Sequence, residues 1–129
     1  MDLHEFSAAC SIVEAAVEGA KGHDITKVTA VNIDLGEFTF LIPEQLAFNF
    51  EIASQNTIVE GAELRINPVK GRLECTDCGY EGEVEPDPEI PEQIAMFAPM
   101  KCPKCKSSAT MITGGKEFVI TNIEAEVET

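Results

Sequence analysis

The hydrophobic positions near the start of the chain repeat with the period of an α-helix. Between residues 5 and 22, apolar side chains recur at intervals of three and four residues, and charged side chains fall between them. The apolar set is Phe6, Ala9, Cys10, Val13, Ala16, Val17 and Ala20. Gly22, with His23 and Asp24 after it, is a typical helix stop. The pattern therefore predicts an amphipathic helix over residues 5–22.

The following residues change to the alternation of a strand and then return to helical spacing. Apolar and polar residues alternate from Lys27 to Leu35, with Val31, Ile33 and Leu35 on one side, which predicts a half-buried strand. Pro43 suits the first turn of a second helix, because its missing N–H is not needed there. That helix is expected to run from about residue 43 to 54 and to bury Leu46, Ala47, Phe50 and Ala53.

Two further segments alternate. Residues 62–69 place Leu64 and Ile66 on one side, and residues 116–127 return to the same period. The expected inward set of the last strand is Val119, Thr121, Ile123, Ala125 and Val127. The element order predicts an α+β fold, with two helices on one face of a three-stranded sheet.

Residues 72–112 have a different character, and we expect them to form an inserted module. The division predicted from the sequence is 1–71 plus 113–129 for the α+β domain and 72–112 for the module. Within the module, "EGEVEPDPEIPEQ" carries six carboxylates and no base, with prolines at positions 86, 88 and 91. This composition is typical of a loop, and the sequence leaves open whether it docks a partner.

The charge excludes several classes of partner. A formal net charge of −14 opposes binding to nucleic acid and to anionic membranes, because both require Lys and Arg to neutralise phosphate. The sequence has no apolar run of about 18 residues and no basic-then-apolar start, so neither a membrane span nor a secretory signal is expected. We expect a cytoplasmic protein.

Four of the five cysteines form two C-x-x-C pairs, Cys75 with Cys78 and Cys102 with Cys105. Two such pairs complete a four-thiolate tetrahedral site, with Zn–S distances near about 2.3 Å. The saturated site leaves no open position for catalysis, which favours a structural zinc-ribbon-like module. Iron suits the same ligands, so the residues alone favour zinc but leave iron open. Cys10 lies on the predicted apolar helix face, where a small core residue is expected.

Histidine is scarce, and His4 stands almost at the amino terminus, with Glu5 beside it and Asp2 nearby. Imidazole, carboxylate and backbone nitrogen form a donor set that suits Ni(II) or Cu(II). Taken alone, a terminal histidine is more often simply solvated. His23, at the end of the predicted helix, has a solvent-facing or capping role as its default.

The order and spacing of several segments change this interpretation. "HEFSAACSIVEAAVEGA", "VNIDLGEF", "TIVEGAELRI", "CTDCG" and "CPKC" together resemble the HypA family of hydrogenase-maturation nickel chaperones, from His4 to the last strand. The resemblance implies a nickel site at the N-terminus, with His4 as principal ligand and Glu5 beside it, in a nickel-binding α+β domain. It implies structural zinc at Cys75, Cys78, Cys102 and Cys105.

The resemblance also implies partners. Family members supply Ni(II), together with a nickel-handling GTPase, to the large subunit of [NiFe]-hydrogenase, and some serve urease. The family begins Met-His-Glu, whereas Asp2 and Leu3 precede His4 here. Two arrangements therefore stay open. His4 binds nickel with other donors, such as Glu5, Asp2 or the 37–40 loop, or removal of Met1 leaves an amine, two amides and the imidazole of His4.

The leading functional hypothesis is a nickel metallochaperone that is not an enzyme. No Ser/His/Asp or Cys/His arrangement and no phosphate-binding Gly-rich loop is evident in the sequence. The second hypothesis is an adaptor whose zinc ribbon binds protein, with His4 incidental. The third is a rubredoxin-like electron carrier, which predicts iron and strong colour.

Overall fold

The computed structural model describes residues 3–84 and 101–128 of the 129-residue chain. Within these residues the elements are α1 (Leu3–Ala20), β1 (Ile25–Gly36), the short 3₁₀ helix η1 (Glu37–Thr39), α2 (Pro43–Ala53), β2 (Glu63–Val69), β3 (Arg72–Cys75), β4 (Glu81–Glu83), β5 (Thr110–Gly114) and β6 (Phe118–Val127). They form two compact units. The first unit comprises Met1–Asp34, Leu41–Asn67 and Phe118–Thr129, and the second comprises Leu35–Phe40 and Pro68–Glu117.

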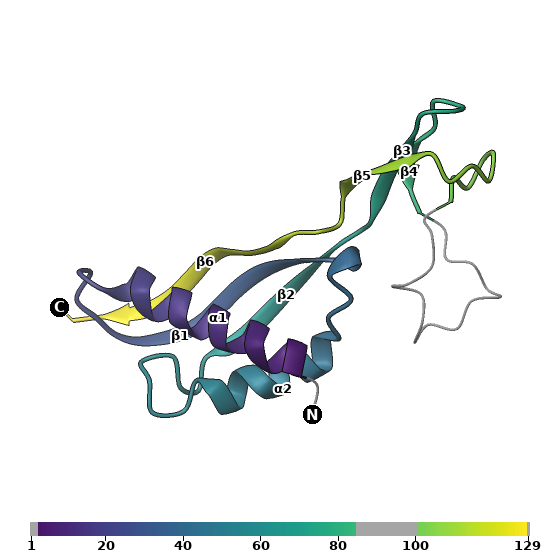
Figure 1. Cartoon of the computed structure of the whole chain (residues 1–129). Helices are drawn as coiled ribbons and strands as arrows, with labels where there is room; N and C mark the ends of the chain where they lie inside the picture. The colour runs from purple at the N-terminus through teal and green to yellow at the C-terminus, as the bar shows by residue number, and fades with distance from the viewer. Residues whose placement is uncertain (1–2, 85–100, 129) are drawn as a thin grey trace. The chain divides into compact units, whose positions relative to one another are not determined.

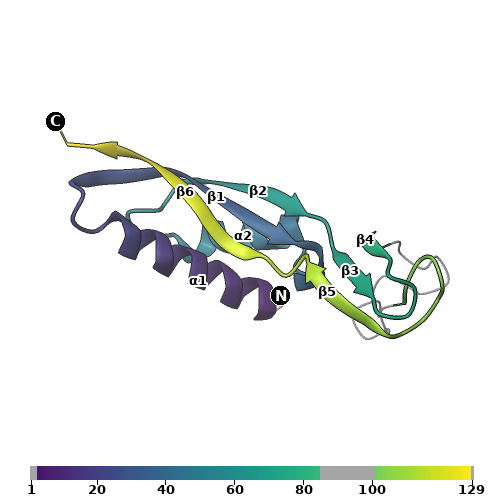
Figure 2. The same ribbon diagram turned by 90° about the horizontal axis from the view of Figure 1, so that it is seen from above.

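The first unit is a layer of two helices on a three-stranded sheet of order β2-β1-β6 (Figure 1). The view from above shows α1 and α2 on the same face of that sheet (Figure 2). Side chains link β1 to β6: Thr26 donates to the carbonyl of Glu126 at 3.2 Å, and Thr29 donates to that of Glu124 at 3.1 Å. The residue numbers run in opposite directions along the two strands, so β1 and β6 are antiparallel. The predicted α+β arrangement of this unit is confirmed.

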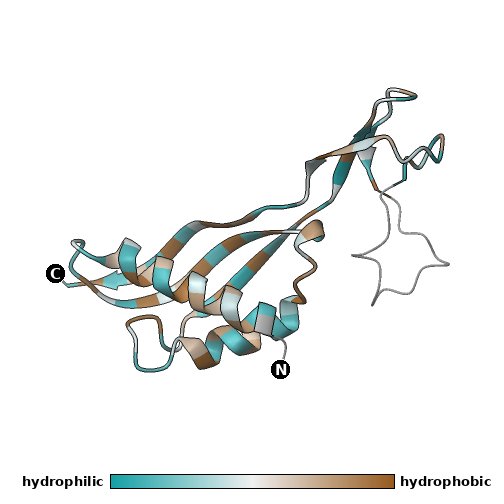
Figure 3. Cartoon of the chain, viewed as in Figure 1, coloured by the Kyte–Doolittle hydropathy of each residue, from teal (hydrophilic) through white to brown (hydrophobic). Residues whose placement is uncertain are grey.

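The core of the first unit lies between the helices and the sheet. Its buried apolar side chains are Ala9, Ile12, Val13, Ala16, Ala20, Val28, Ala30, Val31, Ile33, Leu46, Phe50 and Val59. Apolar and polar residues alternate in the second half of β1, from Val31 to Leu35, and Figure 3 shows hydrophobic and hydrophilic bands along the strands of this sheet. The predicted inward face of β1 is confirmed, because Val31, Ile33 and Leu35 are all buried. Cys10 is half-buried.

The last strand differs in part from the prediction. Ile123 and Ala125 are half-buried, as expected of the inward face. Val119 and Val127, predicted on that same face, are 51% and 56% exposed. Thr121, from the same predicted face, is also exposed. β6 is the last strand in the sheet order, so it has a neighbouring strand on one side only.

The second unit contains a small sheet of order β4-β3-β5, with β3 antiparallel to both neighbours. Leu73, which is 0% exposed, faces Gly82 on one side and Ile112 on the other. The composition of the acidic Pro-rich stretch predicted a loop from residue 81 onward, and this prediction is wrong for Glu81–Glu83, which form β4. Most of the acidic Pro-rich stretch lies outside the described residues, in 85–100.

The second unit also includes the segment after β1. The amide of Gly36 donates to the carbonyl of Glu117 at 2.6 Å, and the amide of Phe38 donates to that of Gly115 at 2.7 Å. These bonds hold residues 35–40 against the chain that follows β5. The compact unit therefore extends beyond the 72–112 module expected from the sequence, into 35–40, 68–71 and 113–117.

Candidate metal centre and amino-terminal site

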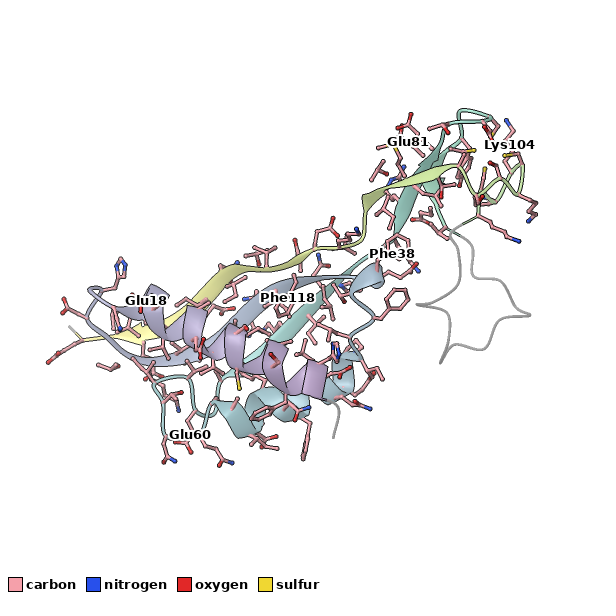
Figure 4. The ribbon with its side chains drawn as sticks, in the orientation of Figure 1. Glu18, Phe38, Glu60, Glu81, Lys104 and Phe118 are labelled. Atoms are coloured by element: carbon pink, nitrogen blue, oxygen red, sulfur yellow. The ribbon has the colours of Figure 1, made fainter. Side chains whose placement is uncertain are left out.

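The four cysteines of the two C-x-x-C pairs meet at one point in the second unit. The sulfurs of Cys75, Cys78, Cys102 and Cys105 all lie within 4.8 Å of one another. The Cys75 and Cys105 sulfurs are 3.6 Å apart, and those of Cys78 and Cys102 are 3.5 Å apart. Sulfur atoms (yellow) gather near Lys104 in Figure 4. The predicted four-cysteine cluster is confirmed.

The two pairs use the same backbone turn, which we call a knuckle: residues 75–80 form the first and residues 102–107 the second. The residue after the second cysteine donates its amide to the carbonyl of the first cysteine, at 2.9 Å from Gly79 to Cys75 and at 2.9 Å from Lys106 to Cys102. The amide of the first cysteine donates to the carbonyl of the residue five positions later, at 2.7 Å from Cys75 to Tyr80 and at 2.9 Å from Cys102 to Ser107. The two C-x-x-C motifs of the sequence therefore adopt the same hydrogen-bonded turn.

Backbone amides stabilise negative charge on one sulfur in particular. The amides of Lys104 and Cys105 lie 3.4 and 3.5 Å from the Cys102 sulfur, and both donate to it. Burial opposes ionisation of Cys102, but these donors outweigh it and lower its pKa to about 7. At Cys105 the amide of Ser107 favours the thiolate, yet burial and the three neighbouring sulfurs raise the pKa to about 12. Four adjacent sulfurs cannot all ionise without a cation.

The arrangement fits a four-coordinate thiophilic metal ion. A tetrahedral zinc with Zn–S bonds of about 2.3 Å separates neighbouring sulfurs by about 3.8 Å. The observed 3.5 and 3.6 Å separations are close to that edge length. The amide donors are the partners that metal-bound thiolates commonly have. Ser107 also donates to Asp77 and so links the second knuckle to the first. The four cysteines could therefore hold one ion and leave it no open position.

The structure separates the environments of the two predicted nickel residues. His4 lies inside the first turn of α1, which begins at Leu3, whereas the apolar spacing predicted a helix that begins at residue 5. His4 is exposed, and Glu5 is 1% exposed. Oε1 of Glu5 accepts a hydrogen bond from the amide of Ile42 at 3.1 Å, and its Oε2 is buried without a partner among the described residues. His23 is exposed in the turn after α1.

Sequence reasoning missed the burial of Glu5, although the spacing contained a signal. Glu5 lies four residues before Ala9 and seven before Ile12, and both of those are buried on α1. It therefore lies on the inward stripe of the helix. We did not expect burial at this position, because carboxylates are rarely buried without a partner. The partner is Ile42, 37 residues away in the sequence.

These features define a class of metal-handling protein, with an α+β unit and a four-cysteine metal module. The family model described as "Hydrogenase/urease nickel incorporation, metallochaperone, hypA" matches residues 3–125. The chain belongs to this HypA family of nickel metallochaperones. The predicted family resemblance is therefore confirmed.

Individual relatives agree with that assignment. Hydrogenase maturation factor HypA of Methanocaldococcus jannaschii is 42% identical over 131 residues, which covers 98% of this chain and 99% of the relative. HypA of Methanothermobacter thermautotrophicus is 37% identical over 125 residues, covering 96% and 98%. The solution structure of the Ni metallochaperone HypA from Helicobacter pylori has a TM-score of 0.62 at 25% identity and covers 96% of this chain and 98% of that one. Within the described residues, neither helix is long and apolar enough to cross a bilayer.

Proposed function

We propose that this chain binds Ni(II) at its N-terminus and helps deliver it to the large subunit of [NiFe]-hydrogenase. A nickel-handling GTPase would act with it, in the cytoplasm. His4 is the principal nickel ligand, and Glu5 belongs to the same site. The observation that carries the proposal is that the family match spans His4, Glu5 and all four cysteines.

The position of His4 supports its role. An exposed imidazole in the first turn of a helix can exchange a metal with a partner, whereas a buried ligand would hold it. Nitrogen and oxygen donors suit Ni(II). Because the imidazole must be neutral to bind, acid should release the ion.

The second unit has a structural role in this proposal. Zn(II) held by Cys75, Cys78, Cys102 and Cys105 would fix the two knuckles and supply no chemistry to nickel transfer. The four-thiolate donor set is soft and saturated, which separates it from the nitrogen and oxygen site that carries the cargo.

The test is calorimetric titration of Ni(II) into the untagged, zinc-loaded protein with its native N-terminus, which mass spectrometry verifies. We expect stoichiometric binding that His4→Ala abolishes. His23→Ala is the matched control, because His23 is also exposed and belongs to the same unit. Binding that survives His4→Ala, or is lost only in His23→Ala, would refute the site. The adaptor hypothesis would then lead.

Delivery needs a separate measurement. Mixing the nickel-loaded chain with the purified GTPase and the apo large subunit should give nickel incorporation that falls in His4→Ala. Partner binding should persist in His4→Ala, because the substitution removes a metal ligand and leaves the fold intact. Equal incorporation with the wild type and His4→Ala would show that the chain assists without carrying the metal.

A further inference from the structure

Glu5 is the one ionisable side chain among the buried polar residues of the described chain; the others are Asn49 and Ser54. Its carboxylate reaches from α1 to the N-cap of α2, with Oε1 on the Ile42 amide and with no partner for Oε2 among the residues that the structure describes. Burying a carboxylate with one oxygen unpaired costs free energy unless the group is held for a reason. The nickel proposal alone does not explain why this side chain faces inward.

Ile42 is the residue just before α2, and its side chain makes no capping hydrogen bond. It is the N-cap, its hydrocarbon side chain has no acceptor, and Pro43 after it has no N–H to donate. Glu5 supplies from α1 an acceptor for the N-cap amide, which in a capping box is the task of a Glu or Gln in the first turn of the same helix. A negative charge at a helix N-terminus is also favoured by the helix dipole. This hydrogen bond connects the first turn of α1 to the N-cap of α2.

We propose that Glu5 is a positioning residue of the nickel site. It acts through the Ile42 amide and not through a bond to the metal. The inference rests on the proposed nickel site at His4 and defines how Glu5 serves it. Successive side chains on a helix point about 100° apart. The hydrogen bond that holds Glu5 inward therefore sets the direction in which His4 points outward. To become a ligand, Glu5 would have to leave both its hydrogen bond and its buried position.

Two substitutions separate positioning from ligation, because they make opposite changes. Ile42→Pro removes the N–H and leaves the Glu5 carboxylate in place. The backbone at residue 42 is extended with φ −89°, so proline, which is fixed at about −65 ± 15°, requires a small backbone adjustment there. The side chain is 45% exposed, so little packing is lost. Glu5→Gln keeps an oxygen that can accept from Ile42 but removes the carboxylate. Ile42→Ala, which keeps the N–H, is the matched control.

We expect Ile42→Pro to weaken Ni(II) binding by about tenfold or more, the range found when an orienting partner of a metal site is lost. Glu5→Gln and Ile42→Ala should remain within a few-fold of wild type. The opposite pattern, severe loss in Glu5→Gln with Ile42→Pro unaffected, would make Glu5 a ligand and overturn the proposal. Because Glu5→Gln should retain the fold, its titration decides the matter even if Ile42→Pro is unstable.

Amide hydrogen exchange at Ile42 separates this inference from the nickel proposal. Glu5→Ala should speed exchange at Ile42 by roughly fivefold, the effect of losing one hydrogen bond, and Glu5→Gln should not. In wild-type protein the Ile42 amide should stay protected when Ni(II) is added. Exchange that accelerates on nickel addition would mean that Glu5 has moved to the metal, and the proposal fails. If the wild-type protein binds no nickel, the nickel site is refuted. If amide exchange at Ile42 is unchanged in Glu5→Ala, the proposed role of the Glu5–Ile42 hydrogen bond is refuted.

Discussion

Gly79 and Lys106 occupy the same position in the two knuckles of the metal module. Each follows the second cysteine of its pair, and each has a left-handed backbone, with φ of 78° and 65°. Each donates its amide to the carbonyl of the first cysteine at 2.9 Å. Glycine adopts this conformation at no steric cost, whereas lysine does not. One knuckle is therefore relaxed and the other is strained at the same point.

The first prediction follows from that difference. Relief of left-handed strain gains about 1–2 kcal/mol, and the added freedom of an unfolded glycine costs about 0.4–1 kcal/mol. Lys106→Gly should therefore raise the free energy of unfolding of the metal-loaded protein by roughly 0.5–1 kcal/mol. Denaturant unfolding followed by a probe in the second unit measures it.

Two variants control that measurement. Lys104→Gly lies in the same knuckle outside the left-handed set, so it should only lower stability slightly. Gly79→Ala should lower it by about 1 kcal/mol or more, through the backbone alone, because an added Cβ there has nothing within 4 Å. If Lys106→Gly and Lys104→Gly behave alike, strain at Lys106 is not the cause.

The sequence was sufficient for the first unit because its elements bury apolar faces with a clear period. The helix spacing found α1, and alternation found β1, whose Val31, Ile33 and Leu35 are all buried. The sheet of the second unit was missed for a physical reason. Its strands are short, and among the described residues of β3 and β4 Leu73 is the one buried large aliphatic side chain. Cysteine spacing revealed the metal centre, but not the strands around it.

The burial of Glu5 could have been inferred from helical spacing, but its hydrogen-bond partner could not, because that contact is distant in sequence. Local pattern places Glu5 and His4 together as neighbours with similar chemistry. The fold separates them, because the Ile42 amide 37 residues later takes the carboxylate and leaves the imidazole exposed. A carboxylate is normally expected at the surface, but Glu5 is buried because it lies on the inward side of α1. The same conflict between residue type and position marks Lys106, where a lysine has the backbone of a glycine.

The second prediction concerns the close approach of two backbone segments within the second unit. The amide of Gly36 bonds to Glu117, and a Cβ at position 36 would overlap the carbonyl of Gly115 and lie 2.7 Å from the amide of Glu117. Backbone atoms cannot move aside as side chains do. Gly36→Ala should therefore cost at least about 3 kcal/mol, the upper part of the range for overpacking. Thermal unfolding measures the loss, and a melting temperature within a degree of wild type would contradict the argument.

Gly19 provides the opposite case and the third prediction. It lies in α1, it is exposed, and a Cβ there has nothing within 4 Å. Gly19→Ala should stabilise the protein by up to about 1 kcal/mol, because alanine loses less conformational freedom in a helix than glycine does. Far-UV circular dichroism during denaturation should show a higher midpoint. A lower midpoint would mean that the glycine serves a contact outside the described residues.

The fourth prediction is that the second unit depends on its metal and the first does not. Among the described residues of the second unit, the buried side chains are two leucines, Leu35 and Leu73, and two cysteines, Cys75 and Cys102; the other buried residues there are glycines. Such a core is too small to offset the chain entropy of ordering the unit. A structural zinc contributes about 10–16 kcal/mol of apparent binding free energy, which is enough. Chelation, or Cys78→Ser, should therefore abolish amide protection in β3 and β5 while α1 stays protected.

The same experiment should also identify the bound metal and include a control variant at Cys10, a cysteine outside the cluster. We expect about one zinc per chain by elemental analysis, since a tetrahedral four-thiolate site takes one ion. Iron instead of zinc would give strong visible colour. Cys10→Ala is the control, because Cys10 is half-buried in α1 and outside the cluster, so zinc content should not change. Protection that persists in β3 after complete metal removal would show that the two leucines suffice. Loss of α1 protection at the same step would show that the units unfold together.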